Sequence, residues 1–136
     1  MARLNVTGMD SLVADLELLG RDVRPVMDRM AQAGADVVAE ERRKEAKRRG
    51  IERTGSMIRN IKAVKPRGND TTGRRVVYSQ GKDKNGTRNA EKEFLEHYGY
   101  RGRSGSHWID SAEAKARNEA GKAMENVFDD FIDGSQ

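Results

Sequence analysis

The stretch Thr54–Tyr78, TGSMIRNIKAVKPRGNDTTGRRVVY, decides the fold. Runs that contain β-branched residues lie at 58–66 and 74–79, and the loop between them is built from glycine, asparagine, aspartate and threonine. Two such runs around a turn-forming loop predict a β-hairpin. Because a two-stranded hairpin alone is only marginally stable in water, this one needs further strands or a helix against one face. Residues 3–8 are a candidate third strand.

The chain before the hairpin has helical periodicity. Apolar residues recur in steps of three and four from Leu12 to Val37, which is typical of an amphipathic helix. Gly20 and Pro25 interrupt the pattern, since glycine commonly ends a helix and proline fits a first helical turn. We therefore expect two helices, at about 10–19 and 24–49.

Two more helices are expected after the hairpin, a short one at 89–98 and a long one at about 111–132. The short helix is expected to direct its apolar residues inward, namely Ala90, Phe94, Leu95 and Tyr98. The elements predict one α+β domain over residues 1–136, with a small antiparallel β-sheet packed against a long N-terminal helix and a C-terminal helix. The expected core comprises Leu16, Val26, Met30, Val37, Ile61, Val76, Phe94, Trp108, Ile109, Val127 and Phe131.

Composition excludes several classes of protein. Charged and hydrophobic residues each make up 35% of the chain, and it has no cysteine, which excludes disulfides and thiolate metal sites. No apolar run approaches the ~20 residues that span a membrane, and the N-terminus lacks the apolar core of a signal peptide. We expect a soluble protein made in a cytoplasm. Its loops at 67–73, 80–89 and 99–106 are expected to be mobile and to order on assembly.

The sequence contains no arrangement typical of catalysis. His97 and His107 occur without cysteine or an HExxH pattern, so zinc would need carboxylates from unrelated segments. The run GKDKNGT at 81–87 lacks the ending of a phosphate-binding P-loop. We therefore predict no enzyme activity, no cofactor, and no catalytic, cofactor-binding or metal-binding residue. The two histidines are expected to form structural hydrogen bonds.

Charge is unevenly distributed along the chain. Residues 41–67 contain 11 basic and 3 acidic side chains, whereas residues 110–136 contain 3 basic and 7 acidic ones. The basic run at 40–49 is either a solvated helix end or a charged arm for an acidic partner or nucleic acid. If it is an arm, opposite charges can set the register between copies. The candidate assembly interface comprises Arg42, Arg43, Lys47, Arg48, Arg49, Asp129, Asp130 and Asp133.

Four short motifs, in order along the chain, carry a family resemblance. They are Gly8-Met9-Asp10 followed by Leu12 and Leu16, Thr54-Gly55 followed by Met57 and Asn60-Ile61, the run Phe94–Tyr100, and the run Ser106–Ala112. In this order they resemble the small tail-completion proteins that join head to tail in the neck of long-tailed bacteriophages. His97 and Tyr98 depart from the family's glutamate and phenylalanine, and no proline precedes Trp108.

The resemblance implies an α+β fold without catalysis and a ring of copies, six or twelve, around the tail axis. It implies contacts with neighbouring neck, connector and tail-tube proteins, and a place in the virion after assembly in the host cytoplasm. Either a head-side adaptor or a tail terminator fits it. The alternative function is a basic DNA-binding module that contacts phosphate, and non-specific contact with DNA is compatible with both. No membrane partner is expected.

Overall fold

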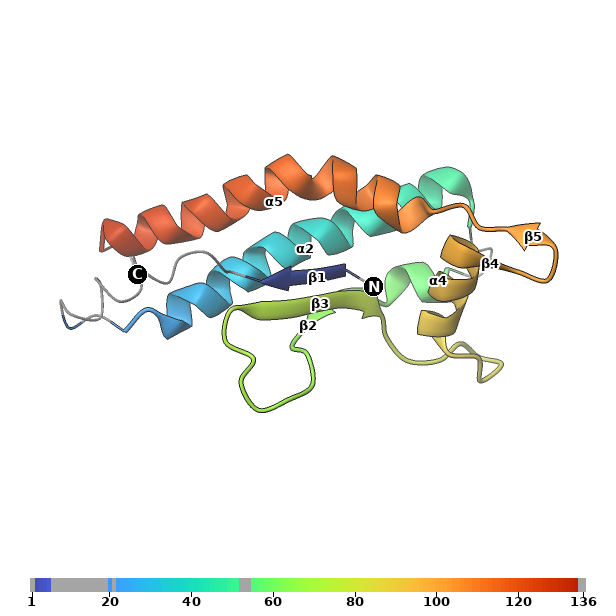
Figure 1. Cartoon of the computed structure of the whole chain (residues 1–136), viewed down its shortest axis with the longest axis horizontal. Helices are drawn as coiled ribbons and strands as arrows, with labels where there is room; N and C mark the ends of the chain where they lie inside the picture. Colours follow the sequence, from blue (N-terminus) through green and yellow to red (C-terminus); the bar gives the residue numbers. More distant parts are fainter. Residues whose placement is uncertain (1, 6–19, 21, 52–54, 135–136) are drawn as a thin grey trace.

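The computed structural model describes residues 2–5, 20, 22–51 and 55–134. The helices and strands follow the order expected for an α+β domain (Figure 1). In chain order they are β1 (Ala2–Asn5), α2 (Arg24–Arg49), α3 (Ser56–Arg59), β2 (Ile61–Val64), β3 (Arg74–Ser79), α4 (Asn89–Tyr98), β4 (Gly99–Tyr100), β5 (Arg103–Ser104) and α5 (Trp108–Ile132). The helix predicted at 10–19 lies outside the described residues, and so do Leu16 and Thr54.

The long helix α2 has the predicted bounds. Pro25 lies in its first turn, and the helix stops at Gly50, whose φ of 62° is left-handed. Glycine adopts this conformation without the steric cost that a side chain would add. The last turn contains Lys47, Arg48 and Arg49, where cations interact favourably with the negative end of the helix dipole.

The predicted hairpin forms two strands of a three-stranded antiparallel sheet, with β3 in the centre. Its strand order is β1-β3-β2, with Val77 opposite Ala2 on one side and Ala63 on the other. The first predicted strand is shorter than expected, because residues 56–59 turn into α3. That turn starts at Gly55, whose φ is 77°, and the Asn60 side chain closes it by donating to the carbonyl of Ser56 at 2.8 Å.

Helix α2 lies between the sheet and α5, which runs antiparallel to it (Figure 1). The main core cluster joins residues of α2, α3, the sheet and the start of α5, with Ile61, Val77 and Trp108 fully buried. A second cluster at the other end of the helix pair contains Val26, Met30 and Phe131. The α+β class is therefore confirmed, including the sheet packed against the helices.

Most of the expected core is buried. Val26, Met30, Ile61, Val76, Trp108, Ile109 and Phe131 are buried, while Val37 and Val127 are half-buried against the two clusters. The prediction is wrong for Phe94, which is 58% exposed. Helix α5 also starts three residues before the predicted Ser111, because Trp108 and Ile109 pack into the core as its first turn.

The three loops have more local structure than their composition suggests. The loop before β3 is held by Gly73, whose N–H donates to Asp28 at 2.8 Å. Asp83 accepts backbone N–H groups of Asn85 and Thr87, each at 2.9 Å. Residues 99–106 contain the small hairpin β4–β5, so this segment is not a plain loop. Mobility of the three loops before assembly stays a prediction.

The β4–β5 hairpin crosses very close to the end of α4. A Cβ atom added at Gly105 would lie 2.2 Å from the carbonyl oxygen of His97, closer than atoms can approach. The crossing therefore requires glycine at 105. It fixes the hairpin against α4 and leads the chain directly into α5. Within the described residues, no helix combines the length and apolar character needed to cross a bilayer.

Candidate functional site

Helix α4 has the opposite orientation to the one its apolar residues predicted. Asn89, Glu93 and His97 recur every fourth residue and form the buried side of the helix. Phe94 and Tyr98, expected to face inward, are 58% and 57% exposed, while Ala90 and Leu95 are half-buried. The helix therefore buries polar groups and presents aromatic ones to solvent, and the reason lies in what the polar groups contact.

A buried ion pair holds α4 to the rest of the molecule. Arg42 of α2 is fully buried and contacts Glu93 at 3.1 Å and Glu113 of α5 at 3.2 Å. It also donates to the carbonyl of Val77 at 3.1 Å. A buried guanidinium needs such partners, because an unpaired charge in the protein interior is very costly. Arg42 thus links both long helices, the sheet and α4, and it requires the acidic side of α4 to face inward.

Glu93 and its neighbours complete this polar interior. Burial raises the pKa of Glu93, although Arg42 and the N–H group of Ser79, which donates to the carboxylate, oppose that effect. One turn earlier, Asn89 donates to the carbonyl of Gln80 at 2.8 Å. Buried polar groups with partners of this kind fix one orientation of a helix, and here they do so in place of Phe94 and Tyr98.

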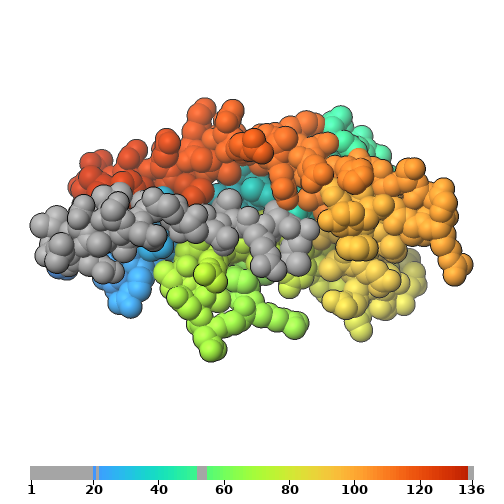
Figure 2. Space-filling model, in the orientation of Figure 1, coloured from blue at the N-terminus to red at the C-terminus, as the bar shows by residue number. Residues whose placement is uncertain are grey.

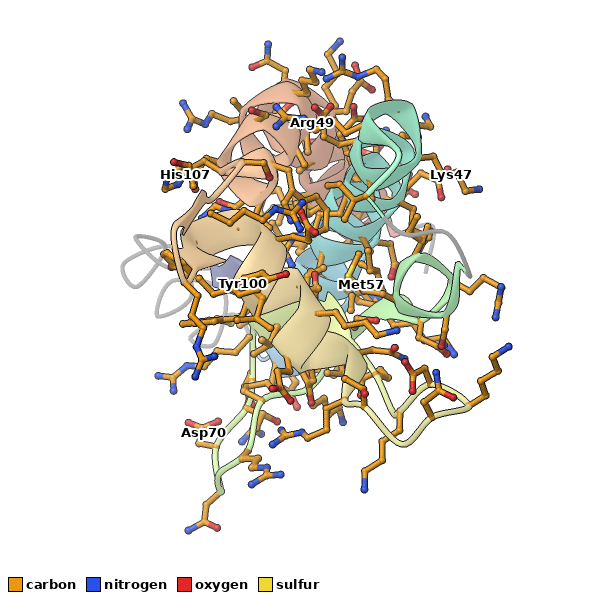
Figure 3. All side chains as sticks on the ribbon, turned by 90° about the vertical axis from the view of Figure 1, so that its right-hand side faces the viewer. Lys47, Arg49, Met57, Asp70, Tyr100 and His107 are labelled. Carbon is orange, nitrogen blue, oxygen red and sulfur yellow. The ribbon has the colours of Figure 1, made fainter. Side chains whose placement is uncertain are left out.

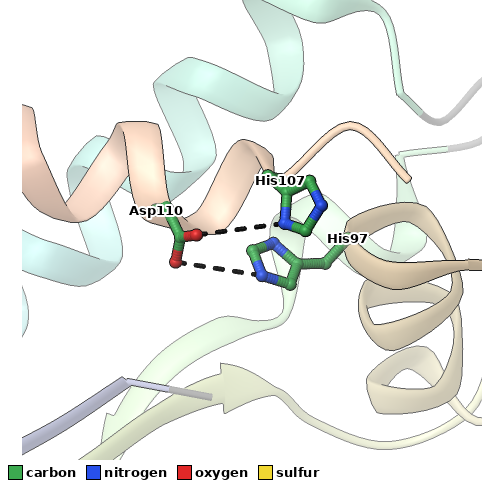
Figure 4. A group of neighbouring side chains, drawn as sticks. All are labelled: His97, His107 and Asp110. Carbon is green, nitrogen blue, oxygen red and sulfur yellow. Dashed lines mark ion pairs between the residues drawn. The ribbon is translucent and has the colours of Figure 1, made fainter. Parts of the chain in front are cut away.

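His97 meets His107 and Asp110 where α4 and α5 converge (Figure 4). The Nε2 atom of His97 lies 3.8 Å from Asp110, the Nδ1 atom of His107 lies 3.9 Å from it, and the two rings are 5.0 Å apart. Two imidazoles and a carboxylate are a common ligand set for zinc and iron, so the group has the composition of a metal site.

The hydrogen bonding of His97 favours a structural role instead. Its Nδ1 atom accepts the N–H group of Ile109 at 3.3 Å, so in the neutral ring Nε2 carries the proton and faces Asp110. Metal-bound histidines usually show the reverse pattern, with the second nitrogen donating to an acceptor. Burial lowers the pKa of His97, partly against the effect of Asp110. The arrangement ties α4 to the first turn of α5.

The outer side of α4 and the adjoining hairpin expose three large hydrophobic side chains close together. We call Phe94, Tyr98 and Tyr100 the aromatic surface; they are 58%, 57% and 46% exposed. The rings of Phe94 and Tyr98 are 4.7 Å apart, and the Arg103 guanidinium lies 5.9 Å from the centre of the Tyr100 ring. Exposed clusters of this type commonly mark sites of protein association.

A shallow hollow of about 160 Å³ adjoins the aromatic surface. It lies at the end of the molecule shown in Figure 3, where Met57, Tyr100, Lys47 and Arg49 are labelled. Its lining residues are Ile51, Met57, Lys92, Leu95, Glu96 and Tyr100. The floor is apolar and the rim is charged, which suits an aliphatic side chain flanked by charged groups.

The predicted basic arm is largely engaged within the chain. Arg42 is buried, so its assignment to an assembly surface is wrong. Arg43 contacts Glu40 and the carbonyl of Ile61. Arg49 donates to the carbonyl of Ser106 at 3.1 Å. Lys47, Arg48 and Arg49 remain exposed around these contacts.

Glu45 is the buried acid that draws these cations back onto the helix. Its carboxylate contacts Arg49 and Lys115, each at 2.7 Å, and also Arg48. Burial raises the pKa of Glu45, but the hydrogen bonds from Lys115, Arg49 and Arg48 outweigh that effect and lower it to about 2. Both earlier interpretations of the basic run are therefore incomplete, because much of its charge is neutralised internally.

The acidic residues of the predicted interface lie far from the basic ones. Asp129, Asp130 and Asp133 are exposed at the C-terminal end of α5. This acidic end and the α4 end lie at opposite ends of the long axis (Figures 1 and 2). The two predicted halves of the interface therefore do not meet within one molecule.

Comparison with protein-family models, with curated proteins and with solved structures gave no match. Function is therefore inferred from the sequence motifs and from the geometry of the α4 end and the acidic end of α5. Two of the motif runs, Phe94–Tyr100 and Ser106–Ala112, meet at the α4 end, where His107 and Ile109 contact His97.

Proposed function

We propose that this protein is a non-enzymatic structural component of a bacteriophage virion, which forms a ring of copies in the neck and helps join head to tail. The observation that carries the proposal is the exposed aromatic surface at α4. The buried polar contacts on the opposite side of the helix keep these rings exposed to solvent. An apolar surface kept exposed in this way favours association with another protein. The four sequence motifs supply the phage and neck part of the proposal.

The distribution of charge supports a closed assembly of identical copies. A ring needs two different surfaces on each copy, one to meet the neighbour on either side. The chain offers an aromatic surface with arginines at one end and an acidic end at the other. The proposal assigns no catalytic residue, because Arg42, Glu93 and Glu45 are committed to ion pairs that hold the fold together.

DNA binding is the second candidate function. The loop between β2 and β3 projects from the sheet (Figure 1) and is flanked by exposed cations. They are Lys62, Lys65, Arg67 and Arg74. Such a group can contact phosphate without reading sequence, which fits a protein through which DNA passes. The two functions can be separated by experiment, because only the first predicts assembly without DNA.

The mass of the purified full chain, measured by light scattering with and without double-stranded DNA, tests the proposal. We expect assemblies of a fixed copy number that form without DNA, and rings of matching size by electron microscopy. A chain that stays monomeric across the concentrations tested, and gains mass only with DNA, would support the second function instead. Antibodies against the chain should label the head–tail junction of particles.

A further inference from the structure

We propose that copies join head to tail, with Ile132 at the acidic end of one copy docking on the aromatic surface of the next. This inference rests on the self-assembly proposed above and names the two surfaces that carry it. In the sequence analysis, the acidic end of α5 was paired with the arginines of α2, which are largely buried or paired within the chain. Here its partner is the α4 end instead.

The first contact surface is the last turn of α5. Ile132 is the final helical residue and is 45% exposed. Asp129, Asp130 and Asp133 surround it, and the last turn contains no basic residue. Carboxylates are unfavourable at the negative end of a helix dipole. Cations from a neighbouring molecule would relieve this repulsion. The turn therefore offers an apolar side chain for contact, and nearby positive charge would stabilise it.

The receiving surface supplies the matching features. The hollow of about 160 Å³ has Met57 at its floor, with Leu95 and Tyr100 beside it. A cavity of about 150 Å³ can accommodate a benzene molecule, so an isoleucine side chain fits this space. Arg101 and Arg103 of the hairpin are exposed next to the rings. Arg103 contacts Glu96 at 3.2 Å, but its guanidinium is exposed, so both arginines can also meet the aspartates of a docked neighbour.

Aromatic area adds to the hollow. A packed aromatic side chain buries about 150–250 Å², and the three rings of the aromatic surface are about half exposed. Together they present roughly 300 Å² of ring surface, comparable with the largest apolar patch on a typical monomer. Burial of this area is expected to supply most of the affinity, while the exposed charges set orientation and register.

Charge favours a second copy in this orientation over a symmetric pair. Two α4 ends brought face to face would oppose their arginines, and two acidic ends would oppose their aspartates. A head-to-tail contact instead places each charge against its opposite. Because the two surfaces lie at opposite ends of the long axis (Figure 1), each copy can bind a neighbour on both sides. Head-to-tail contacts form a ring when the rotation between copies closes, and an open filament when it does not.

The test uses two full-length variants, each defective at one end. Ile132→Lys blocks the acidic end and places a favourable cation at the end of α5. The double variant Phe94→Glu with Tyr100→Glu blocks the aromatic surface at exposed positions. Arg117→Glu, on an exposed position within α5, is the control for a charge change elsewhere. Circular dichroism must first show that each variant is folded.

Mass photometry and sedimentation give the readout. We expect wild type and the control to assemble. Each end variant alone should self-associate at least about 30-fold more weakly than wild type. An equimolar mixture of the two end variants should form dimers and nothing larger, because only one functional contact remains per pair. This dimer is the signature of a head-to-tail contact.

Other outcomes overturn the inference in distinguishable ways. If wild type assembles and both end variants assemble equally well, the contact is wrong while the proposed ring stands. If only the aromatic variant fails, or if the mixture forms no dimer, the aromatic surface binds a different part of the neighbour or another protein. If wild type itself stays monomeric and unjoined particles do not recruit it, the proposed function falls as well.

Discussion

The two ends of the α2–α5 helix pair are built on opposite principles. One end is held by apolar contacts among Val26, Met30 and Phe131, and its surface is acidic. The other adds the buried ion pairs of Arg42 to the apolar cluster around Trp108, and its surface is aromatic. The same helical periodicity is therefore compatible with an apolar or a polar interior. The buried partners of a helix determine which of its residues are exposed.

Removing the charge of Arg42 should cause the largest loss of stability. Arg42→Met leaves Glu93 buried without its main partner, and breaking a buried pair typically costs about 3–5 kcal/mol. Adding Glu93→Leu should recover much of this loss, since an apolar pair of similar volume can replace buried ions. Urea unfolding followed by circular dichroism measures both. A single variant as stable as wild type would mean that the ion pair does not hold the α4 end.

A truncation at the apolar end is expected to cost somewhat less. Met30→Ala removes most of a side chain that is 5% exposed, and the lost transfer energy with the remaining cavity should cost about 2–4 kcal/mol. This loss should be independent of pH between 5 and 8, because the surrounding cluster is apolar. A strong pH dependence of the loss would contradict the proposed contrast.

Glu45 should make the α4 end sensitive to acid. Its folded pKa of about 2 lies below the ordinary 4.5, so the ionised form stabilises the fold above pH 4.5. That stability is lost as the pH falls from 4.5 towards 2. Glu45→Gln should cost about 1–3 kcal/mol at pH 7 and much less at pH 2. Unfolding curves for wild type and Glu45→Gln over this pH range measure the difference in stability. A difference that does not change with pH would argue against the role of the ionised Glu45.

His97 should contribute a smaller effect at milder pH. Because burial lowers its pKa below the ordinary 6.5, the unfolded chain binds the proton more readily than the folded one. Stability should therefore decrease as the pH falls from 6.5 towards the folded value. His97→Gln should flatten this part of the pH profile. An unchanged profile would assign the slope to another group.

The outer side of α4 should matter least for the monomer. Phe94→Ser changes a side chain that is 58% exposed, and surface substitutions usually alter stability by less than about 0.5 kcal/mol. The same substitution at a packed position would cost several times more. Thermal unfolding of the dilute protein measures the effect. A large loss would show that Phe94 packs within the chain rather than serving an external contact.

Local signals in the sequence were sufficient for much of the fold. Pro25 and Gly50 bound α2, and the β-branched run before Ser79 marks the central strand. These elements could be predicted because their start and stop signals act within a few residues. The three-residue shift at the start of α5 could not, since it depends on the tertiary packing of Trp108 and on the N–H group of Ile109 bonding to His97.

The orientation of α4 shows where the sequence reasoning failed. Phe94 and Tyr98 were expected inside because apolar residues usually face the core. A signal for the opposite was present, since Arg42 and Glu45 continue the buried side of α2 beyond Val38 and Ala39. A charged residue in that position needs an opposite charge from another element, and Glu93 on α4 supplies it. Pairing distant charges requires the fold, so periodicity alone could not choose.

The position of α2 between the sheet and α5 also bears on synthesis. Strand β1 precedes α2 and β2 follows α3 within a few residues, but α5 comes only after the hairpins and α4. At about 5–20 residues per second, a ribosome needs on the order of ten seconds to add the intervening chain. During that interval the side of α2 meant for α5 has no native partner. A nascent chain paused before Trp108 should therefore bind chaperones that release it once α5 emerges.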